Sequence, residues 1–409
     1  MSKIKIKSFG PIKEGFVEND GWMDLAKVTV FIGNQGAGKS TVAKLISILT
    51  WIEKALVRGD FKEKDLNAYN RFKKHCAYQN IVNYFKDDTL IAYIGKAYSL
   101  TYFEGNTNII KNHQNGYSFP KIMYIPSERN FVSTVDKPSS YKKLPSALYT
   151  FLDEFQDANQ ALKGDLALPI GNVKFEYQRL NNISYLIGND YKIRLTEASS
   201  GFQSFVPLYL VSRYLAYSII KENDESVKSI SVEEEKRIRK EIETILSNPH
   251  LSDDVKKASL EYLSSRFKYS SFVNIVEEPE QNLFPISQRQ MLNSLLEFTN
   301  MTEGNRLVIT THSPYIISYL TLAVKAYLVM EKAEKSSKKD TIKEKTNAIV
   351  PIISTLKPHE LIIYEIDDNG KIIKLENYKG LPSDENYLNE KLTETNDLFV
   401  NLLEIEKTI

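Results

Sequence analysis

The alternation of apolar and polar residues divides this chain into strands and helices. Residues 4–9 alternate with a period of two, as an edge strand would, and residues 21–32 predict one or two more strands. Residues 40–56 carry apolar residues at helical spacing. Continuous apolar runs at 121–125, 271–276 and 306–310 are typical of buried strands. The pattern therefore predicts an α/β fold.

The remaining segments are expected around this framework. Residues 90–104 and 116–119 predict strands of a β subdomain, and 173–177, 184–187 and 191–195 predict a meander. Residues 361–366 and 371–376 predict a hairpin. Further helices are expected at 65–85, 146–162, 205–220, 286–300, from 314 onward and at 385–406. The charged stretch 222–267 predicts a short helical hairpin, and the lysine-rich run 332–345 a solvated loop or helix end.

Composition removes several functional classes. The chain has 409 residues, 42% of them hydrophobic and 26% charged, which is typical of a globular protein with a large core. The formal net charge is +1, so nucleic acid could be attracted only by a local patch. A single cysteine, Cys76, excludes an internal disulfide. Because no apolar run is long enough to span a bilayer and no secretory signal is apparent, we expect a cytoplasmic protein with no membrane partner.

Residues 33–40, with the sequence GNQGAGKS, match G-x-x-x-x-G-K-[ST] at every fixed position. A β-branched strand precedes this loop and a helical pattern follows it, in the order that a phosphate-binding loop requires. Glycines let backbone N–H groups converge on phosphate oxygens, and the helix N-terminus favours the anion. We expect Lys39 to reach the β- and γ-phosphates and Ser40 to bind Mg²⁺.

Two later strands end in residues that suit the same chemistry. Glu277 and Glu278 follow the run 271–276, where one carboxylate can hold Mg²⁺ and the next can polarise the attacking water. His312 follows the run 306–310, about 35 residues later, where a γ-phosphate sensor is expected. The small residues at 195–204 precede an apolar helix, and they fit either an anion site or an ordinary helix cap.

The order of these motifs carries a resemblance. The P-loop, Ser-Gly-x-Gln over 200–203, Glu-Glu-Pro-Glu over 277–280 and Thr-His-Ser-Pro over 311–314 resemble the ABC/SMC-type ATPases. The set is most similar to the RecF- and OLD-like AAA-family ATPases of bacterial anti-phage defence operons. The resemblance implies an ABC-type ATPase head with a mixed β-sheet, an antiparallel β subdomain and a helical lobe. It also implies one domain over 1–409, with an N-terminal lobe at 1–220, a helical insert at 221–268 and a C-terminal lobe at 269–409.

The resemblance implies a role for each matching residue. Glu277 matches the Walker B metal ligand, Glu278 the catalytic glutamate and His312 the switch histidine, while Lys39 contributes to catalysis and Ser40 also binds the metal. Asn282 lies at the D-loop position. ATP-binding residues of the Walker A loop are expected at Gly33, Asn34, Gln35, Gly36, Ala37, Gly38, Lys39, Ser40 and Thr41. Signature residues are expected at Ser200, Gly201 and Gln203, which in this family complete the site of the opposite subunit in an ATP-sandwich homodimer.

The sequence departs from the family pattern in several places. Glu277 stands where the family usually has Asp, and Phe202 replaces the second signature glycine, which predicts slow hydrolysis. The Q-loop is not identified, and Arg129 is expected to contact phosphate or an interface. The tail after residue 354 is too short for the TOPRIM nuclease domain of OLD proteins.

Three functions stay open at this point. The leading hypothesis is an ATPase subunit of a bacterial defence complex, a homodimer or larger homo-oligomer that controls an effector nuclease of HNH or TOPRIM type. The second is a RecF/SMC-like DNA-repair clamp with a basic face drawn from Lys62, Lys64, Arg71, Lys73, Lys74, Lys142 and Lys143. The third is a nucleotide-gated scaffold with little turnover, which would use the lysine-rich run and the leucine-bearing C-terminal segment for contacts.

Overall fold

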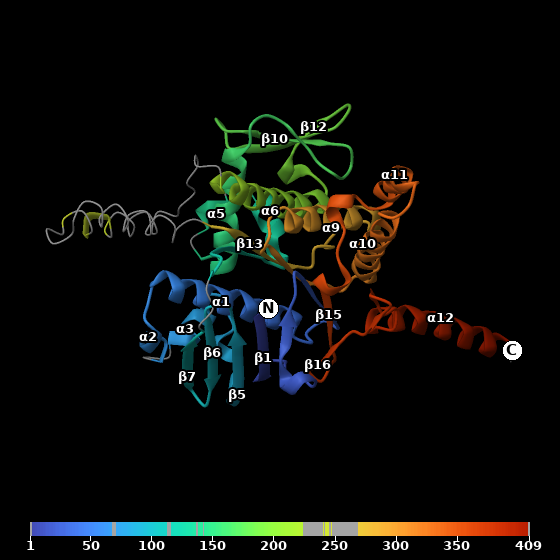
Figure 1. Cartoon of the computed structure of the whole chain (residues 1–409). Helices are drawn as coiled ribbons and strands as arrows, with labels where there is room; N and C mark the ends of the chain where they lie inside the picture. Colours follow the sequence, from blue (N-terminus) through green and yellow to red (C-terminus); the bar gives the residue numbers. More distant parts are fainter. Residues whose placement is uncertain are drawn as a thin grey trace.

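The protein is built in layers around one phosphate-loop helix (Figure 1). The computed structural model describes residues 2–67, 71–112, 116–135, 138–141, 143–223 and 269–407, together with 240, 242–244 and 247. A helical lobe covers one face of a central sheet, and the helix α1 (Lys39–Arg58) covers the other. A second, antiparallel sheet packs on the far side of α1. This arrangement confirms the α/β fold with a mixed sheet, an antiparallel β subdomain and a helical lobe.

The central sheet has seven strands in the order β2-β16-β15-β4-β14-β13-β8. β4 (Val28–Gly33), β8 (Pro120–Ile125), β13 (Ser271–Glu277), β14 (Arg306–Thr310) and β15 (Leu361–Ile366) are parallel. β16 (Lys371–Lys374) pairs antiparallel with β15, and β2 (Gly15–Phe16) pairs parallel with β16. Because β4, β14 and β13 are neighbours, their carboxyl ends meet at one edge of the sheet. The apolar runs predicted at 121–125, 271–276 and 306–310 are the strands β8, β13 and β14, and the prediction that they are buried strands is confirmed.

The antiparallel sheet has the order β3-β1-β5-β6-β7. Its strands are β1 (Ser2–Phe9), β3 (Met23–Leu25), β5 (Phe85–Ile94), β6 (Tyr98–Phe103) and β7 (Asn106–Lys111). β1 is paired on both sides, so the prediction of an N-terminal edge strand is wrong. Residues 116–119, also predicted as a strand, lie outside any strand, and β8 begins at Pro120. Ile46 and Leu49 of α1 pack in the same core as Ile91 of β5.

The helical lobe rests on the opposite face of the central sheet. It contains α5 (Ser146–Ala161), α6 (Ser200–Asn223), α9 (Pro285–Asn300) and α10 (Pro314–Ala333). A four-stranded sheet of β9 (Leu166–Ala167), β10 (Lys174–Gln178), β11 (Ile183–Ile187) and β12 (Lys192–Arg194) lies beyond it, as the predicted meander. Val28, Val30 and Ile32 of β4 point into this lobe, whereas Phe31 points toward α1.

Peripheral elements differ more from the predictions. The expected helix at 65–85 is divided into α2 (Glu63–Asn67) and α3 (Arg71–Ala77), and the lysine-rich run ends in a helix, α11 (Lys339–Ile349). β17 (Asn377–Tyr378) and β18 (Leu381–Pro382) form a small hairpin before α12 (Tyr387–Glu406). The predicted helical hairpin at 222–267 lies almost wholly outside the described residues. None of the described helices combines the length and apolarity needed to cross a bilayer.

Candidate active site

The loop between β4 and α1 depends on glycine at two positions. Gly33 and Gly38 have φ of 142° and 118°, in the region that disfavours side chains. A Cβ on Gly33 would lie 2.2 Å from the carbonyl oxygen of Ile366, and one on Gly38 would lie 2.5 Å from Cδ1 of Ile12. Gly36 has φ of 79° but no atom within 4 Å of its ideal Cβ. Neighbouring residues thus leave no room for a side chain at Gly33 and Gly38, the two ends of the loop, whereas there is room for one at Gly36 in its centre.

Lys39 turns back over this loop. Its Nζ donates hydrogen bonds to the carbonyl oxygens of Gly33 (2.9 Å) and Asn34 (2.8 Å). Nζ also lies 3.4 Å from Nδ1 of His312. The ammonium is buried, and burial lowers the pKa of Lys39 to about 8, against the attraction of Glu278, Glu280 and Glu277. The carboxylates that attract the Lys39 ammonium therefore lie at the carboxyl end of β13 and in the turn that follows it.

His312 joins Lys39 to Glu278. Its Nε2 lies 3.6 Å from Oε1 of Glu278, so the three side chains form one continuous row. Burial and the Lys39 charge lower the pKa of His312, which favours the neutral imidazole at pH 7. Burial and the neighbouring Glu277 raise the pKa of Glu278. Three residues from distant parts of the chain therefore meet at the carboxyl edge of the sheet.

Glu277 lies beside this row and is deeply buried. Its Oε2 accepts a hydrogen bond from the backbone N–H of Ser127 (3.3 Å). Within the described residues, Oε1 of Glu277 has no partner, and neither does the nearby Oγ1 of Thr310, which pairs with Glu277 in the sheet. Buried polar atoms without a partner are rare. A carboxylate and hydroxyl oxygens are ligands that Mg²⁺ accepts. This donor set therefore fits a magnesium ion.

Glu280 is a functional candidate that the sequence reasoning missed. Its Oε1 accepts hydrogen bonds from the Thr311 hydroxyl (2.8 Å) and from the backbone N–H of His312 (2.8 Å). The carboxylate is buried, and burial raises its pKa. Glu280 thus fixes the backbone that carries the His312 imidazole. The signal in the sequence was a third carboxylate directly after Pro279, in the same motif as Glu277 and Glu278.

Arg129 has a different position from the predicted one. Its guanidinium is fully buried and donates to the carbonyl oxygens of Glu277 (2.7 Å) and Glu278 (2.6 Å). Further hydrogen bonds reach the carbonyl oxygens of Pro126 and Ser204, both 3.3 Å away. Burial lowers the pKa of Arg129 to about 10. The prediction that it contacts phosphate or an interface is wrong, because its donors are used on the backbone beneath the carboxylates.

The predicted signature residues lie at the start of α6, apart from the loop at 33–40 of their own chain. Ser200 begins α6, and a Cβ on Gly201 would lie 3.0 Å from the carbonyl oxygen of Asn282. Asn282 donates from Nδ2 to Oγ of Ser204 (3.0 Å), and Gln203 donates from Nε2 to the Thr196 carbonyl oxygen (2.9 Å). Ser200, Gly201 and Gln203 are all described, and none of them hydrogen-bonds to the loop at 33–40. The structure therefore does not bring them to Lys39.

The predicted basic face is partly engaged in internal contacts. Nζ of Lys73 lies 5.1 Å from the centroid of the Phe85 ring, and Arg71 lies 3.9 Å from Asp65. Lys62, Lys64, Lys74 and Lys143 are exposed. Lys142 is outside the described residues. The face therefore combines exposed lysines with one lysine, Lys73, that packs against the β subdomain.

Comparison with known proteins gives a family-level result for part of the chain. Residues 256–317 match the AAA ATPase domain, a stretch that includes Glu277, Glu278 and His312. This match supports an ATPase. Among curated proteins, none matches the sequence.

Two structures of MJ0796, described as a bacterial ABC transporter cassette, align with 92% of this chain and 100% of theirs, at 10% identity and a TM-score of 0.25. One is a dimer, and the other is a dimeric post-hydrolysis state bound to ADP and Pi. A nucleotide-free ATP-binding cassette from an ABC transporter aligns over 93% of this chain and 92% of its own, with 13% identity and a TM-score of 0.26.

Proposed function

We propose that the protein is an ATP-binding and hydrolysing subunit of a cytoplasmic bacterial defence complex. The observation that carries the ATPase part is the row of Lys39, His312 and Glu278 beside the buried, half-partnered Glu277. Glu277 ends β13, and the other three residues come from the segments that follow β4, β13 and β14. The order of the motifs along the chain, which resembles the defence ATPases, supports the biological role.

Each residue of the row suits one part of phosphoryl transfer. The Lys39 ammonium, now held by two carbonyl oxygens, can exchange them for β- and γ-phosphate oxygens of ATP. Glu278 is half-buried with a raised pKa, so its carboxylate is a better general base for the attacking water than a solvated one. Neutral His312 can donate one hydrogen bond to a γ-phosphate oxygen. Mg²⁺, held by Glu277 and Ser40, would neutralise the phosphate charge.

We further propose that two copies form an ATP-sandwich dimer. Ser200, Gly201 and Gln203 do not reach the loop of their own chain, which supports a role opposite a second copy. Phe202, at the position of the second signature glycine, packs against Gly171 and predicts slow turnover. Dimers or larger homo-oligomers would then control an effector nuclease of HNH or TOPRIM type. Among the described residues, His, Cys, Asp and Glu side chains form no metal-binding group of three or more, so the magnesium site proposed above would depend on Glu277 together with hydroxyl oxygens.

Phosphate release from ATP and Mg²⁺ tests the proposal. We expect slow turnover by the wild-type protein and a loss of at least about 100-fold in Glu278→Gln, because the amide cannot take a proton from water. The same variant should accumulate as an ATP-bound dimer on a sizing column. Glu303→Gln, on an exposed loop, is the matched control. Equal turnover in the wild type and Glu278→Gln would contradict the ATPase assignment. Co-purification of a nuclease encoded in the neighbouring reading frame tests the effector.

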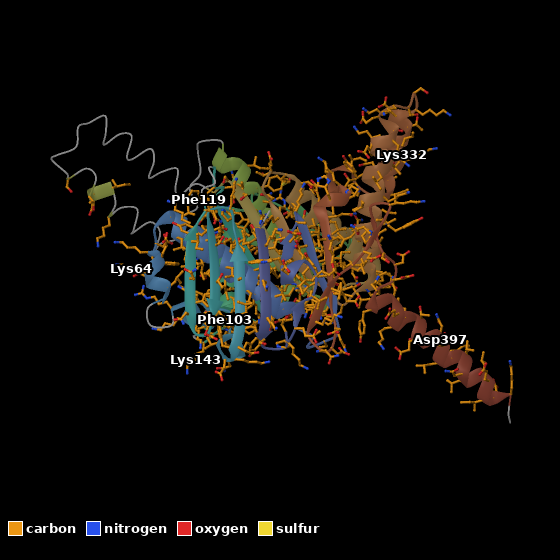
Figure 2. The ribbon with its side chains drawn as sticks, turned by 60° about the horizontal axis from the view of Figure 1, so that its bottom comes forward. Lys64, Phe103, Phe119, Lys143, Lys332 and Asp397 are labelled. Atoms are coloured by element: carbon orange, nitrogen blue, oxygen red, sulfur yellow. The ribbon has the colours of Figure 1, made fainter. Side chains whose placement is uncertain are left out.

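A nucleotide-gated scaffold is the second candidate, and α12 supports it. This helix extends away from the body, where Figure 2 marks it with Asp397. It presents large apolar side chains that are each between 41% and 63% exposed: Leu392, Leu398, Phe399, Val400, Leu402, Leu403 and Ile405. Such a surface supports a role of α12 in contacts with a partner. Deletion of residues 385–409 should lower the oligomeric state or abolish partner binding while ATP turnover persists. Unchanged assembly would exclude this role.

A further inference from the structure

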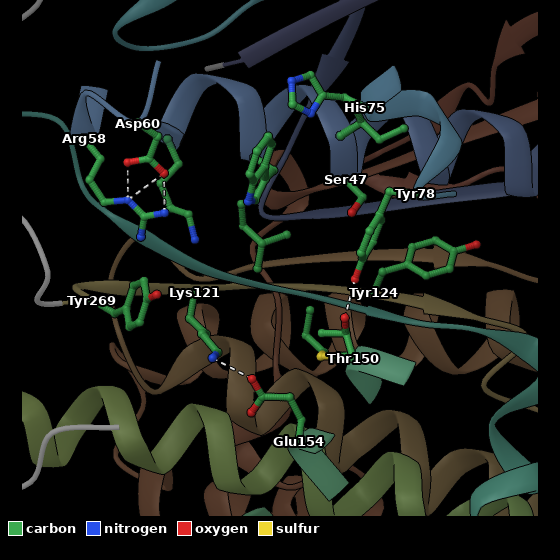
Figure 3. Close-up of a pocket in the computed structure, with 15 residues that line it drawn as sticks. Ser47, Arg58, Asp60, His75, Tyr78, Lys121, Tyr124, Thr150, Glu154 and Tyr269 are labelled. Carbon is green, nitrogen blue, oxygen red and sulfur yellow. Dashed lines mark hydrogen bonds and ion pairs between the residues drawn. The ribbon is translucent and has the colours of Figure 1, made fainter. Parts of the chain in front are cut away.

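Polar side chains tie separate elements of the fold together at several points. A cavity of about 680 Å³, bounded by α1, α3, β8 and α5, has two such ties in its lining (Figure 3). Lys121 pairs with Glu154 at 2.6 Å, and Tyr78 donates to Thr150 over 2.6 Å. The residues that line this cavity do not include the row of the proposed active site. Another tie, made by Gln288, has both of its ends in the loops that carry that row.

Gln288 lies in α9 and joins two loops of the proposed active site. Its Nε2 donates to the carbonyl oxygen of Leu283 over 2.9 Å, and its Oε1 accepts from the hydroxyl of Ser313 over 2.7 Å. Leu283 ends the turn that begins at Glu278, and Ser313 follows His312. Gln288 is 8% exposed and Ser313 is 5% exposed, and hydrogen bonds gain strength away from water. One buried amide therefore connects the carboxylate turn to the histidine loop.

The hydroxyl of Ser313 is used in an unusual way. Ser313 is the N-cap of α10, where a serine oxygen commonly accepts a hydrogen bond from a backbone N–H of the first turn. No side-chain cap hydrogen bond is present at this helix end, and the hydroxyl donates to Gln288 instead. The tie thus takes the place of an interaction that would stabilise α10 by itself.

The turn held by Gln288 is strained. Glu278 has φ of 44° and Asn282 has φ of 60°, and such conformations persist only where surrounding contacts hold them. The N–H of Leu283 donates to the carbonyl oxygen of Glu280 over 2.9 Å, and Nδ2 of Asn282 donates to Oγ of Ser204 over 3.0 Å. Gln288 adds a contact from α9 to these contacts, at the carbonyl oxygen of Leu283.

The side chains above this backbone are less enclosed. The His312 side chain is 33% exposed and that of Glu278 is 35% exposed, while Nε2 of His312 lies 3.6 Å from Oε1 of Glu278. Partly solvated tips can adopt several rotamers, so packing around them does not fix this distance. The backbone of the two loops must therefore fix it.

We propose that Gln288 is a positioning residue that sets the distance between Glu278 and His312. An amide suits this task because it donates to a carbonyl oxygen and accepts from a hydroxyl at the same time. The inference rests on the proposed ATPase function. Both hydrogen bonds of the Gln288 side chain end in the turn at 278–283 and in the histidine loop, not in the loop at 33–40. Loss of the tie should therefore lower turnover more than the affinity for ATP.

Two substitutions separate positioning from filling of space. Gln288→Met keeps the size of the side chain without its polar atoms, and we expect kcat to fall at least about tenfold, with KM for ATP within about twofold of the wild type. Gln288→Glu keeps both hydrogen bonds only while the new carboxyl is protonated, and burial raises its pKa. Its turnover relative to the wild type should therefore fall as the pH rises, whereas a side chain that only fills space would give a constant ratio.

A measurement without ATP keeps this inference separate from the ATPase proposal. The chain has five histidines, so ¹³C-labelled histidine gives few NMR signals, and the signal of His312 is the one missing from His312→Gln. In the nucleotide-free protein, Gln288→Met and Ser313→Ala should each shift or broaden this signal, because each removes one end of the tie. Gln290→Met, on the same helix and only partly buried, should leave the signal and the turnover unchanged.

Thermal melts confirm that the variants fold. The inference is overturned by an unchanged His312 signal in a folded Gln288→Met variant. With an active wild type, it is also overturned by unchanged turnover in that variant or by a constant activity ratio for Gln288→Glu across pH. A wild type without turnover whose His312 signal does respond to Gln288→Met would contradict the ATPase proposal and still support the tie.

Discussion

The guanidinium of Arg129 holds the backbone of Glu278, with Nη2 donating to the Glu278 carbonyl oxygen over 2.6 Å. Nη1 does the same for Glu277 over 2.7 Å. Glu278 has a positive φ of 44°, a conformation that costs free energy for a residue with a side chain. A fully buried cation therefore stabilises the strained turn on which both carboxylates stand, and it makes this position sensitive to substitution.

Replacement of Arg129 should destabilise the fold and the site together. Arg129→Met leaves four buried carbonyl oxygens without their donor, and we expect it to lower the free energy of unfolding by about 3 kcal/mol or more. Arg129→Lys restores the charge but not the forked geometry, so it should recover only part of the loss. Urea unfolding measures this. Arg179→Met, whose guanidinium is exposed, should shift stability by less than about 0.5 kcal/mol. A neutral Arg129→Met would show that the carbonyl oxygens find other donors.

The affinity for ATP should fall as pH rises above 8. The pKa of Lys39 is about 8 without nucleotide, and phosphate oxygens around the ammonium raise it in the complex. Below pH 8 the ammonium is charged in both states and the affinity is flat. Between pH 8 and the raised pKa of the complex, binding requires proton uptake, so the affinity falls by up to about tenfold per pH unit. Isothermal titration at pH 7, 8 and 9 checks the slope, and Lys39→Met should bind weakly with no such slope.

The residues of the candidate active site could be predicted from the sequence, whereas the buried residue that holds their backbone in place could not. The strands 271–276 and 306–310 are continuous apolar runs, so parallel pairing brings Glu278 and His312 to one edge without further information. The prediction for Arg129 failed because its partners are backbone carbonyl oxygens, which every sequence has and no motif marks. The N-terminal strand alternates in polarity, yet both of its edges are paired, since alternation reports which face is buried and not which edge is covered.

The glycines of the phosphate loop should differ in cost when replaced. In the nucleotide-free protein, Gly33→Ala drives a Cβ against the carbonyl oxygen of Ile366 in a neighbouring strand, and we expect a loss of about 3 kcal/mol or more. Gly36→Ala meets no atom within 4 Å and costs only its left-handed backbone, about 1 kcal/mol. Thermal unfolding without ATP compares the two. Equal losses would show that the loop shifts to relieve the clash at Gly33.

Glu280 should act as a positioning residue for His312. Its Oε1 accepts from the backbone N–H of His312 and from the Thr311 hydroxyl, so Glu280→Ala leaves two buried donors unpaired and should lower the free energy of unfolding by about 2–4 kcal/mol. Glu280→Gln keeps an acceptor oxygen for both donors. We therefore expect it to retain most of the stability and of the ATP turnover, whereas Glu280→Ala should lose turnover with little change in ATP affinity.

Glu303→Ala, on an exposed loop, is the control for removal of a carboxylate. Urea unfolding, phosphate release and titration of ATP separate these effects. If Glu280→Gln lost as much turnover as Glu280→Ala, then the charge of Glu280 and not its hydrogen bonds would matter to the row that joins Lys39, His312 and Glu278.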